Sequence, residues 1–117
     1  MSYNPTPDPA LTYHKVSTAS TNADVIKNTP GSVSGWYIYN SNASSRKVVL
    51  HNTATTPTAG AGVFMSMVIP PTSGANVSFP FGINFSAGIG ITTVNGNPDA
   101  DATAVGLNDL IINIFYR

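Results

Sequence analysis

The second half of the chain, residues 63–117, is a series of short apolar segments that Gly and Pro interrupt at close intervals. Within several segments apolar and polar side chains alternate, which places one kind of side chain on each face of a β-strand. Pro cannot donate a hydrogen bond to a strand ladder, and Gly and Pro together favour turns. We therefore expect short strands in this half of the chain, and a scaffold or binding surface in preference to an enzyme.

The same pattern extends through the first half, with turn signals about every 8–12 residues. Roughly eight short strands and no helix predict an all-β, single-domain β-sandwich or jelly roll. The expected strands cover residues 11–16, 21–27, 33–40, 46–52, 63–69, 75–79, 83–85, 88–94 and 110–116.

The segment 33–40 carries aromatic residues on both of its predicted faces. Strict alternation puts Val33, Gly35, Tyr37 and Tyr39 on one face, and Trp36 and Ile38 on the other. Such a strand suits the middle of a sandwich or a subunit interface. The polar turn that follows predicts a hairpin between this strand and the next.

Composition limits the classes of function. The 117 residues are enough for one domain. Only 9% are charged, none is Glu, and the net charge is zero, so the cationic contacts that nucleic acids require are lacking. No apolar run approaches the roughly 20 residues of a membrane span, and no signal-peptide pattern opens the chain. We expect no nucleic-acid or membrane partner, and a protein made and kept in the cytosol.

Two segments are candidates for contact with a partner. Residues 1–10 hold Pro at every second position from Pro5, which favours an extended arm. This arm is either a frayed terminus or a docking arm, and residues 11–117 form the domain. The loop 53–62 is long, and long loops often bind. The predicted contact residues are Tyr3, Pro5, Pro7, Thr55 and Pro57.

Side chains capable of catalysis or metal binding are few. His14 and His51 are the only histidines, and the chain has no Cys to complete a metal site around either. Asp99, Asp101 and Asp109 form an acidic region that could offer oxygen ligands to a cation, but turn-stabilising Asp side chains explain the pattern better. We expect no catalytic residue, no metal and no cofactor.

The aromatic side chains allow two interpretations. Exposed, they would make a platform on which sugars stack; buried, they would be core, which is the usual place for aromatic residues in strands. We expect core. The residues concerned are Trp36, Tyr37, Tyr39, Phe64, Phe79, Phe81, Phe85, Phe115 and Tyr116.

One stretch carries a family resemblance. Residues 82–89 read Gly-Ile-Asn-Phe-Ser-Ala-Gly-Ile, which resembles a Gly-Ile-x-Phe-Ser-x-Gly-Ile stretch of small virion proteins of tailed bacteriophages. Residues 35–52 resemble their strand, Asn-x-x-Ala turn, basic residue and second strand. Residues 99–103 and 108–117 resemble their Asp-containing loop and closing strand, so the resemblance covers about residues 25–117.

The resemblance implies a β-sandwich of jelly-roll type in the virion. It implies a capsid decoration (cement) protein, made in the cytoplasm of the bacterial host, that binds the major capsid protein on the outer surface of a phage head. Such proteins often form homotrimers at local three-fold positions. The alternative is a carbohydrate- or receptor-binding β-sandwich of a tail or head fibre, which would expose aromatic residues and bind host glycans.

Overall fold

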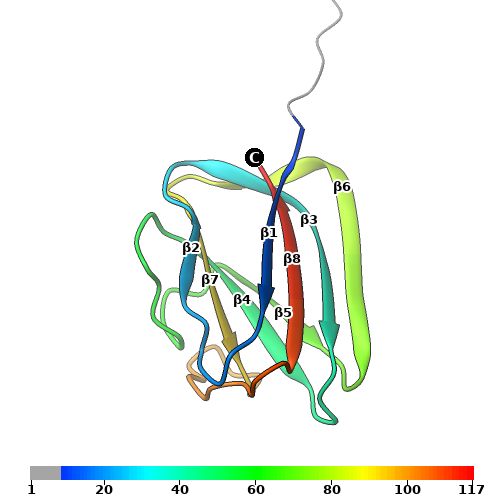
Figure 1. Cartoon of the computed structure of the whole chain (residues 1–117). Coiled ribbons are helices and arrows are strands. Elements are labelled where there is room, and N and C mark those ends of the chain that lie inside the picture. The colour runs from blue at the N-terminus through cyan, green and yellow to red at the C-terminus, as the bar shows by residue number, and fades with distance from the viewer. Residues whose placement is uncertain (1–8) are drawn as a thin grey trace, which may run out of the picture.

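The computed structural model describes residues 9–117, and every regular element in this range is a β-strand (Figure 1). No helix in this range is long and apolar enough to cross a membrane. The predicted arm, residues 1–10, falls outside the described range except for Pro9 and Ala10, which are exposed and precede the first strand. The strands are β1 (Leu11–Val16), β2 (Asp24–Lys27), β3 (Gly31–Asn40), β4 (Arg46–Asn52), β5 (Met65–Ile69), β6 (Ser73–Phe85), β7 (Ile89–Val94) and β8 (Leu110–Tyr116).

The strands form two four-stranded antiparallel sheets. Sheet A has the order β1-β8-β3-β6 and sheet B the order β2-β7-β4-β5. Figure 1 shows β1, β8, β3 and β6 side by side as one layer, with the strands of sheet B as the other. The all-β prediction is therefore confirmed, and most of its strand positions agree with the structure.

The two sheets enclose one hydrophobic core. Sheet A contributes Ile38, Ile112 and Ile114, and sheet B contributes Leu50 and Ile91, all at most 1% exposed. Burial of these side chains is the main favourable contribution to the folding of a chain without disulfides.

The predicted hairpin between residues 33–40 and 46–52 is wrong. β3 pairs with β6 and β8 in sheet A, whereas β4 pairs with β5 and β7 in sheet B. The intervening turn crosses from one sheet to the other, with the Asn40 side-chain amide donating to the Ser44 carbonyl at 2.9 Å. Both edges of β3 are already occupied by strands far away in sequence, so no edge remains for β4.

The predicted faces of β3 are also corrected in part. The register of β3 shifts between Val33 and Gly35 against both of its neighbours. This bulge turns the strand, so Val33 lies in the core together with Ile38, while Tyr37 and Tyr39 are exposed. Simple alternation cannot anticipate this change of face.

The bulge has its counterpart in β6. The sequence predicts separate strands at 75–79 and 83–85, and the structure joins them into one strand of 13 residues. Ser78 pairs with Gly35 and Ile83 with Val33, so residues 79–82 form an extended bulge. Phe81 lies in this bulge with 88% of its surface exposed.

Candidate binding surface

The outer face of sheet A, on the side away from the core, is apolar over much of its area. In the β8–β3 ladder Ile111 lies opposite Tyr39, and Phe115 lies opposite Gly35. In the β1–β8 ladder Val16 lies opposite Ile111. Because directly opposed residues of antiparallel strands share a face, these side chains form one surface. We define the outer patch as Val16, Tyr37, Tyr39, Ile111 and Phe115.

The two tyrosines form the β3 side of the outer patch. Tyr37 is 55% exposed and Tyr39 45% exposed, which is unusual for aromatic side chains on an inner strand of a sheet. The Tyr37 ring packs edge-on against Phe115, with ring centroids 5.4 Å apart. This contact fixes the orientation of the Tyr37 ring and leaves much of the side chain accessible.

A polar pair interrupts the outer face, because Asn113 lies between Ile111 and Phe115 on β8 and pairs with His14 on β1. The Nδ1–H of His14 donates to the Asn113 side-chain oxygen at 2.8 Å, and the Asn113 amide nitrogen donates to the Tyr37 carbonyl at 3.2 Å. Apolar side chains with a few polar groups among them are found at protein interfaces. The sequence interpretation placed the aromatic residues in the core and so missed Tyr37 and Tyr39. The presence of aromatic residues on both predicted faces of segment 33–40 was the available signal.

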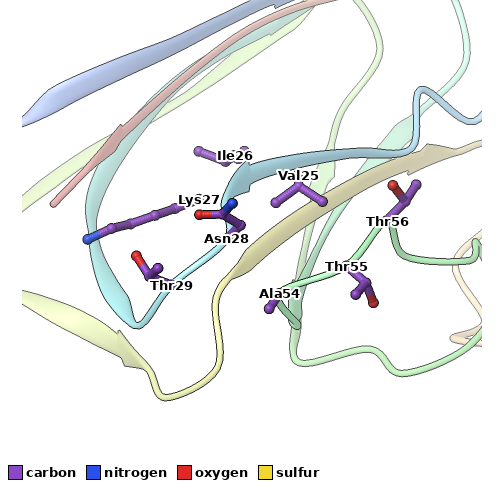
Figure 2. Close-up of a pocket in the computed structure, with 8 residues that line it drawn as sticks. All are labelled: Val25, Ile26, Lys27, Asn28, Thr29, Ala54, Thr55 and Thr56. Atoms are coloured by element: carbon purple, nitrogen blue, oxygen red, sulfur yellow. The ribbon is translucent and has the colours of Figure 1, made fainter.

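The loop 53–62, predicted as a contact surface, has six exposed residues and no buried one. Thr55 is exposed, and it borders an open pocket of about 720 Å³ between the end of β2 and the start of this loop. Figure 2 shows the lining of this pocket, residues 25–29 and 54–56, in which Lys27 is the only titratable side chain. One ammonium group supplies no acid–base pair.

Pro57 faces a different, smaller pocket of about 240 Å³, together with His51. A Cβ atom on Gly90 would lie 3.1 Å from Cγ of Pro57, so this proline packs closely on β7. Thr55 and Pro57 therefore border two separate pockets. The predicted contacts Tyr3, Pro5 and Pro7 lie outside the described residues.

His51 is buried beneath the loop 53–62. It is 1% exposed; its Nδ1–H donates to the Gly62 carbonyl at 3.0 Å, and its Nε2 accepts from the Thr92 hydroxyl at 2.8 Å. The Nδ1 bond attaches the loop to sheet B, and the Nε2 bond joins β4 to β7 within that sheet. Among residues 9–117 no group of three or more His, Cys, Asp or Glu could hold a metal ion.

Burial lowers the pKa of His51 below its usual value of about 6.5, despite the opposing effect of the Gly62 carbonyl. As pH falls below this value, the unfolded chain binds a proton that the folded chain binds less readily, so the free energy of unfolding decreases. We expect chemical unfolding between pH 7 and pH 5 to record this loss. His51→Gln should reduce it, and His14→Gln should retain it because His51 remains.

The acidic side chains stabilise turns, as the turn interpretation expected. Oδ2 of Asp101 accepts from the Gly96 amide at 2.8 Å and from the Thr103 hydroxyl at 2.7 Å, and these bonds lower the pKa of Asp101. Asp109 accepts from the Gly106 amide at 2.7 Å and from Nε of Arg46 at 2.8 Å. Asp99 is exposed. The carboxylates therefore bond to separate parts of the chain.

Comparisons of the chain with protein-family models, curated proteins and solved structures find no match. The assignment of a function therefore depends on the geometry of the outer patch and on the resemblance in residues 25–117.

Proposed function

We propose that this chain is a structural, non-enzymatic protein of a bacteriophage particle, a capsid decoration (cement) protein that binds the outer surface of the head. The observation that supports this proposal best is the outer patch: an exposed aromatic and aliphatic sheet face on a chain with zero net charge and 9% charged residues. Contiguous apolar surfaces of this kind mark sites of protein association.

The strand order supports the finer part of the proposal, a jelly roll. A jelly roll has eight strands in two sheets, connected as two Greek keys. In sheet A, the order β1-β8-β3-β6 pairs the first strand with the last and the third with the sixth. In sheet B, the order β2-β7-β4-β5 pairs the second strand with the seventh and the fourth with the fifth. Successive strands thus alternate between the sheets at every step except β4 to β5, which are neighbours in sheet B. This is the connectivity of nested Greek keys, which viral capsid domains often use.

The outer patch provides a mechanism for stabilising a head. If Tyr37 and Tyr39 pack across a joint between capsid subunits, the decoration protein binds the assembled shell and not its separated subunits. A ligand that binds only one state shifts the equilibrium toward that state. The major capsid protein is the proposed partner, and the head surface the proposed location.

The test uses phage particles with and without the gene for this chain. We expect the protein in purified heads separated from tails, and we expect heads that lack it to release DNA at a lower temperature. Recovery of the protein in the tail fraction, with unchanged thermal release of DNA from mutant heads, would contradict the proposal.

Substitution of the patch gives a sharper prediction. Tyr37→Ser combined with Tyr39→Ser should weaken binding to undecorated heads by roughly 30-fold or more, since a central aromatic residue at an interface typically contributes about 2 kcal/mol. The matched control is Val68→Ser, which removes a 46% exposed side chain from sheet B. Quantitative pelleting with heads measures both, and equal binding by the double variant and the control would argue against the patch.

The exposed tyrosines also favour a second candidate, the carbohydrate-binding protein of a fibre. Two accessible aromatic rings on a flat sheet can stack on sugar rings, with His14 and Asn113 available beside them for hydrogen bonds. This candidate predicts binding of host surface glycans by the purified chain, and loss of that binding in the same double tyrosine variant. Binding to heads without binding to glycans would exclude it.

A further inference from the structure

Three of the four edge strands carry features that oppose pairing with another chain. β2 has only four residues and a register shift, β5 has five and is followed by Pro70, and β6 contains Pro80 within its extended bulge. Short strands, prolines and bulges are the usual means of protecting an edge. β1 is different, because its six residues pair with β8 in unbroken register and include no Pro.

The direction of the backbone groups of β1 follows from one hydrogen bond. The Ser17 amide donates to the Leu110 carbonyl at 2.9 Å, so Ser17 directs its amide toward β8. In an antiparallel ladder this direction alternates from residue to residue. Thr12, His14 and Val16 therefore direct their N–H and C=O groups away from β8. Within residues 9–117, no strand pairs with that side of β1.

We infer that this edge pairs with β1 of a second copy of the chain, antiparallel and about a two-fold axis at His14. A two-fold axis perpendicular to the sheet places the outer faces of both copies on the same side of the joined sheet. Even-numbered residues of one β1 can therefore lie opposite only even-numbered residues of the other, and odd-numbered residues opposite odd-numbered ones. Centred on His14, the register sets Thr12 opposite Val16 of the second copy, and His14 opposite itself. Each N–H and C=O of the three residues then finds a partner.

Charge supports a second copy as the occupant. Lys15 is the only charged residue of β1, and an edge lysine normally opposes pairing. In this register Lys15 lies opposite Tyr13 of the second copy. The Tyr13 hydroxyl donates to the Asp24 carboxylate at 2.9 Å, which brings an exposed carboxylate within reach of the lysine. The symmetry produces this contact twice, between chains of zero net charge.

The pairing joins two copies of sheet A into one continuous sheet, with both outer patches on the same side. A particle or glycan surface would then meet two patches at once, and binding by two linked sites is stronger than binding by one. The inference does not depend on the proposed function, because the purified chain alone tests it.

The test compares two substitutions at the two-fold axis. His14→Ala and His14→Pro both remove the side-chain bond to Asn113, but only proline removes the N–H at the free edge. Because this N–H does not face β8, the proline is compatible with the fold. By light scattering over a dilution series, the wild type and His14→Ala should have twice the 12.2 kDa chain mass, and His14→Pro should be monomeric. Circular dichroism checks that each variant is folded.

Two further measurements do not depend on the proline variant. The amides of Thr12, His14 and Val16 in the wild type should exchange with solvent more slowly as concentration rises. Since the chain has no Cys, a short bis-maleimide should link His14→Cys into dimers and leave Asn76→Cys, on the opposite edge strand, largely unlinked. A monomeric wild type at every concentration would overturn the inference. The partner of this edge would then be an extended segment of another protein. An oligomer that His14→Pro does not alter, including the homotrimer expected from the resemblance, would also overturn it.

Discussion

Lys47→Ala is expected to lower the free energy of unfolding by about 3 kcal/mol. Lys47 is 1% exposed, and its Nζ donates to the carbonyls of Asn97 at 2.8 Å and Pro98 at 3.1 Å. Alanine would remove the packing of the aliphatic stem, leave a cavity, and deprive both carbonyls of a charged donor. These carbonyls belong to the loop that connects β7 to β8, so the attachment of this loop to sheet B should weaken as well.

Lys47→Met separates the two contributions. Methionine keeps most of the apolar stem and removes the ammonium group, so we expect a smaller loss of about 1–2 kcal/mol. The half-buried Lys27 provides the control, and Lys27→Ala should cost less than either change. Urea unfolding followed by the fluorescence of Trp36, the only tryptophan, measures all three. Equal losses for Lys47→Ala and Lys27→Ala would contradict the structural role of Lys47.

Asp109→Ala is expected to have a similar effect, a loss of about 3 kcal/mol. Asp109 and Arg46 form an ion pair at 2.8 Å, with side chains 11% and 14% exposed. The same carboxylate accepts from the Asn42 side chain at 3.0 Å and the Gly106 amide at 2.7 Å. Alanine would leave a largely buried guanidinium without its partner, together with unpaired donors on two further residues.

Two controls test the role of Asp109: removal of an exposed carboxylate, and the dependence of stability on acid pH. Asp99→Ala removes an exposed carboxylate and should change stability by less than about 0.5 kcal/mol. Burial alone would raise the pKa of Asp109, but the bonds to Arg46, Asn42 and Gly106 outweigh it, and the net pKa is lowered. The contribution is thus complete above the ordinary Asp pKa of about 3.9 and is lost as pH falls toward the lowered value. Asp109→Asn should weaken this acid dependence in urea unfolding; an unchanged dependence would assign it to other carboxylates.

The local signals in the sequence were sufficient for most of the strands, with β6 as the exception. The strand-forming residues of 11–16 and 46–52, and the prolines that follow residue 69, predict element ends that agree with β1, β4 and β5. These signals depend on the preferences of neighbouring residues for extended backbone or turns, which hold before any tertiary contact forms.

The pairing of the strands was not available from the same signals. A short polar turn between two strands is typical of a hairpin, yet β3 and β4 lie in different sheets. Pairing depends on which edges and apolar faces can be satisfied together over the whole chain, and these contacts join residues far apart, such as Val16 and Ile111. The bulge at Val33 is decided in the same way, by the fit of β3 to two neighbours at once.

The properties of the candidate surfaces also fall into those that the sequence predicts and those that only tertiary contacts decide. By itself, the sequence determined an all-β chain with few charges, few groups capable of catalysis, and turn-forming Asp side chains, because composition and short-range preference are properties of the residues themselves. Only the tertiary structure decided that Lys47 and His51 are buried, that Tyr37 and Tyr39 are exposed, and that β1 has an open edge. Whether an outward side chain meets solvent depends on the loops that cover its sheet, and here residues 53–62 and 95–109 pack on sheet B, while the outer patch of sheet A remains accessible.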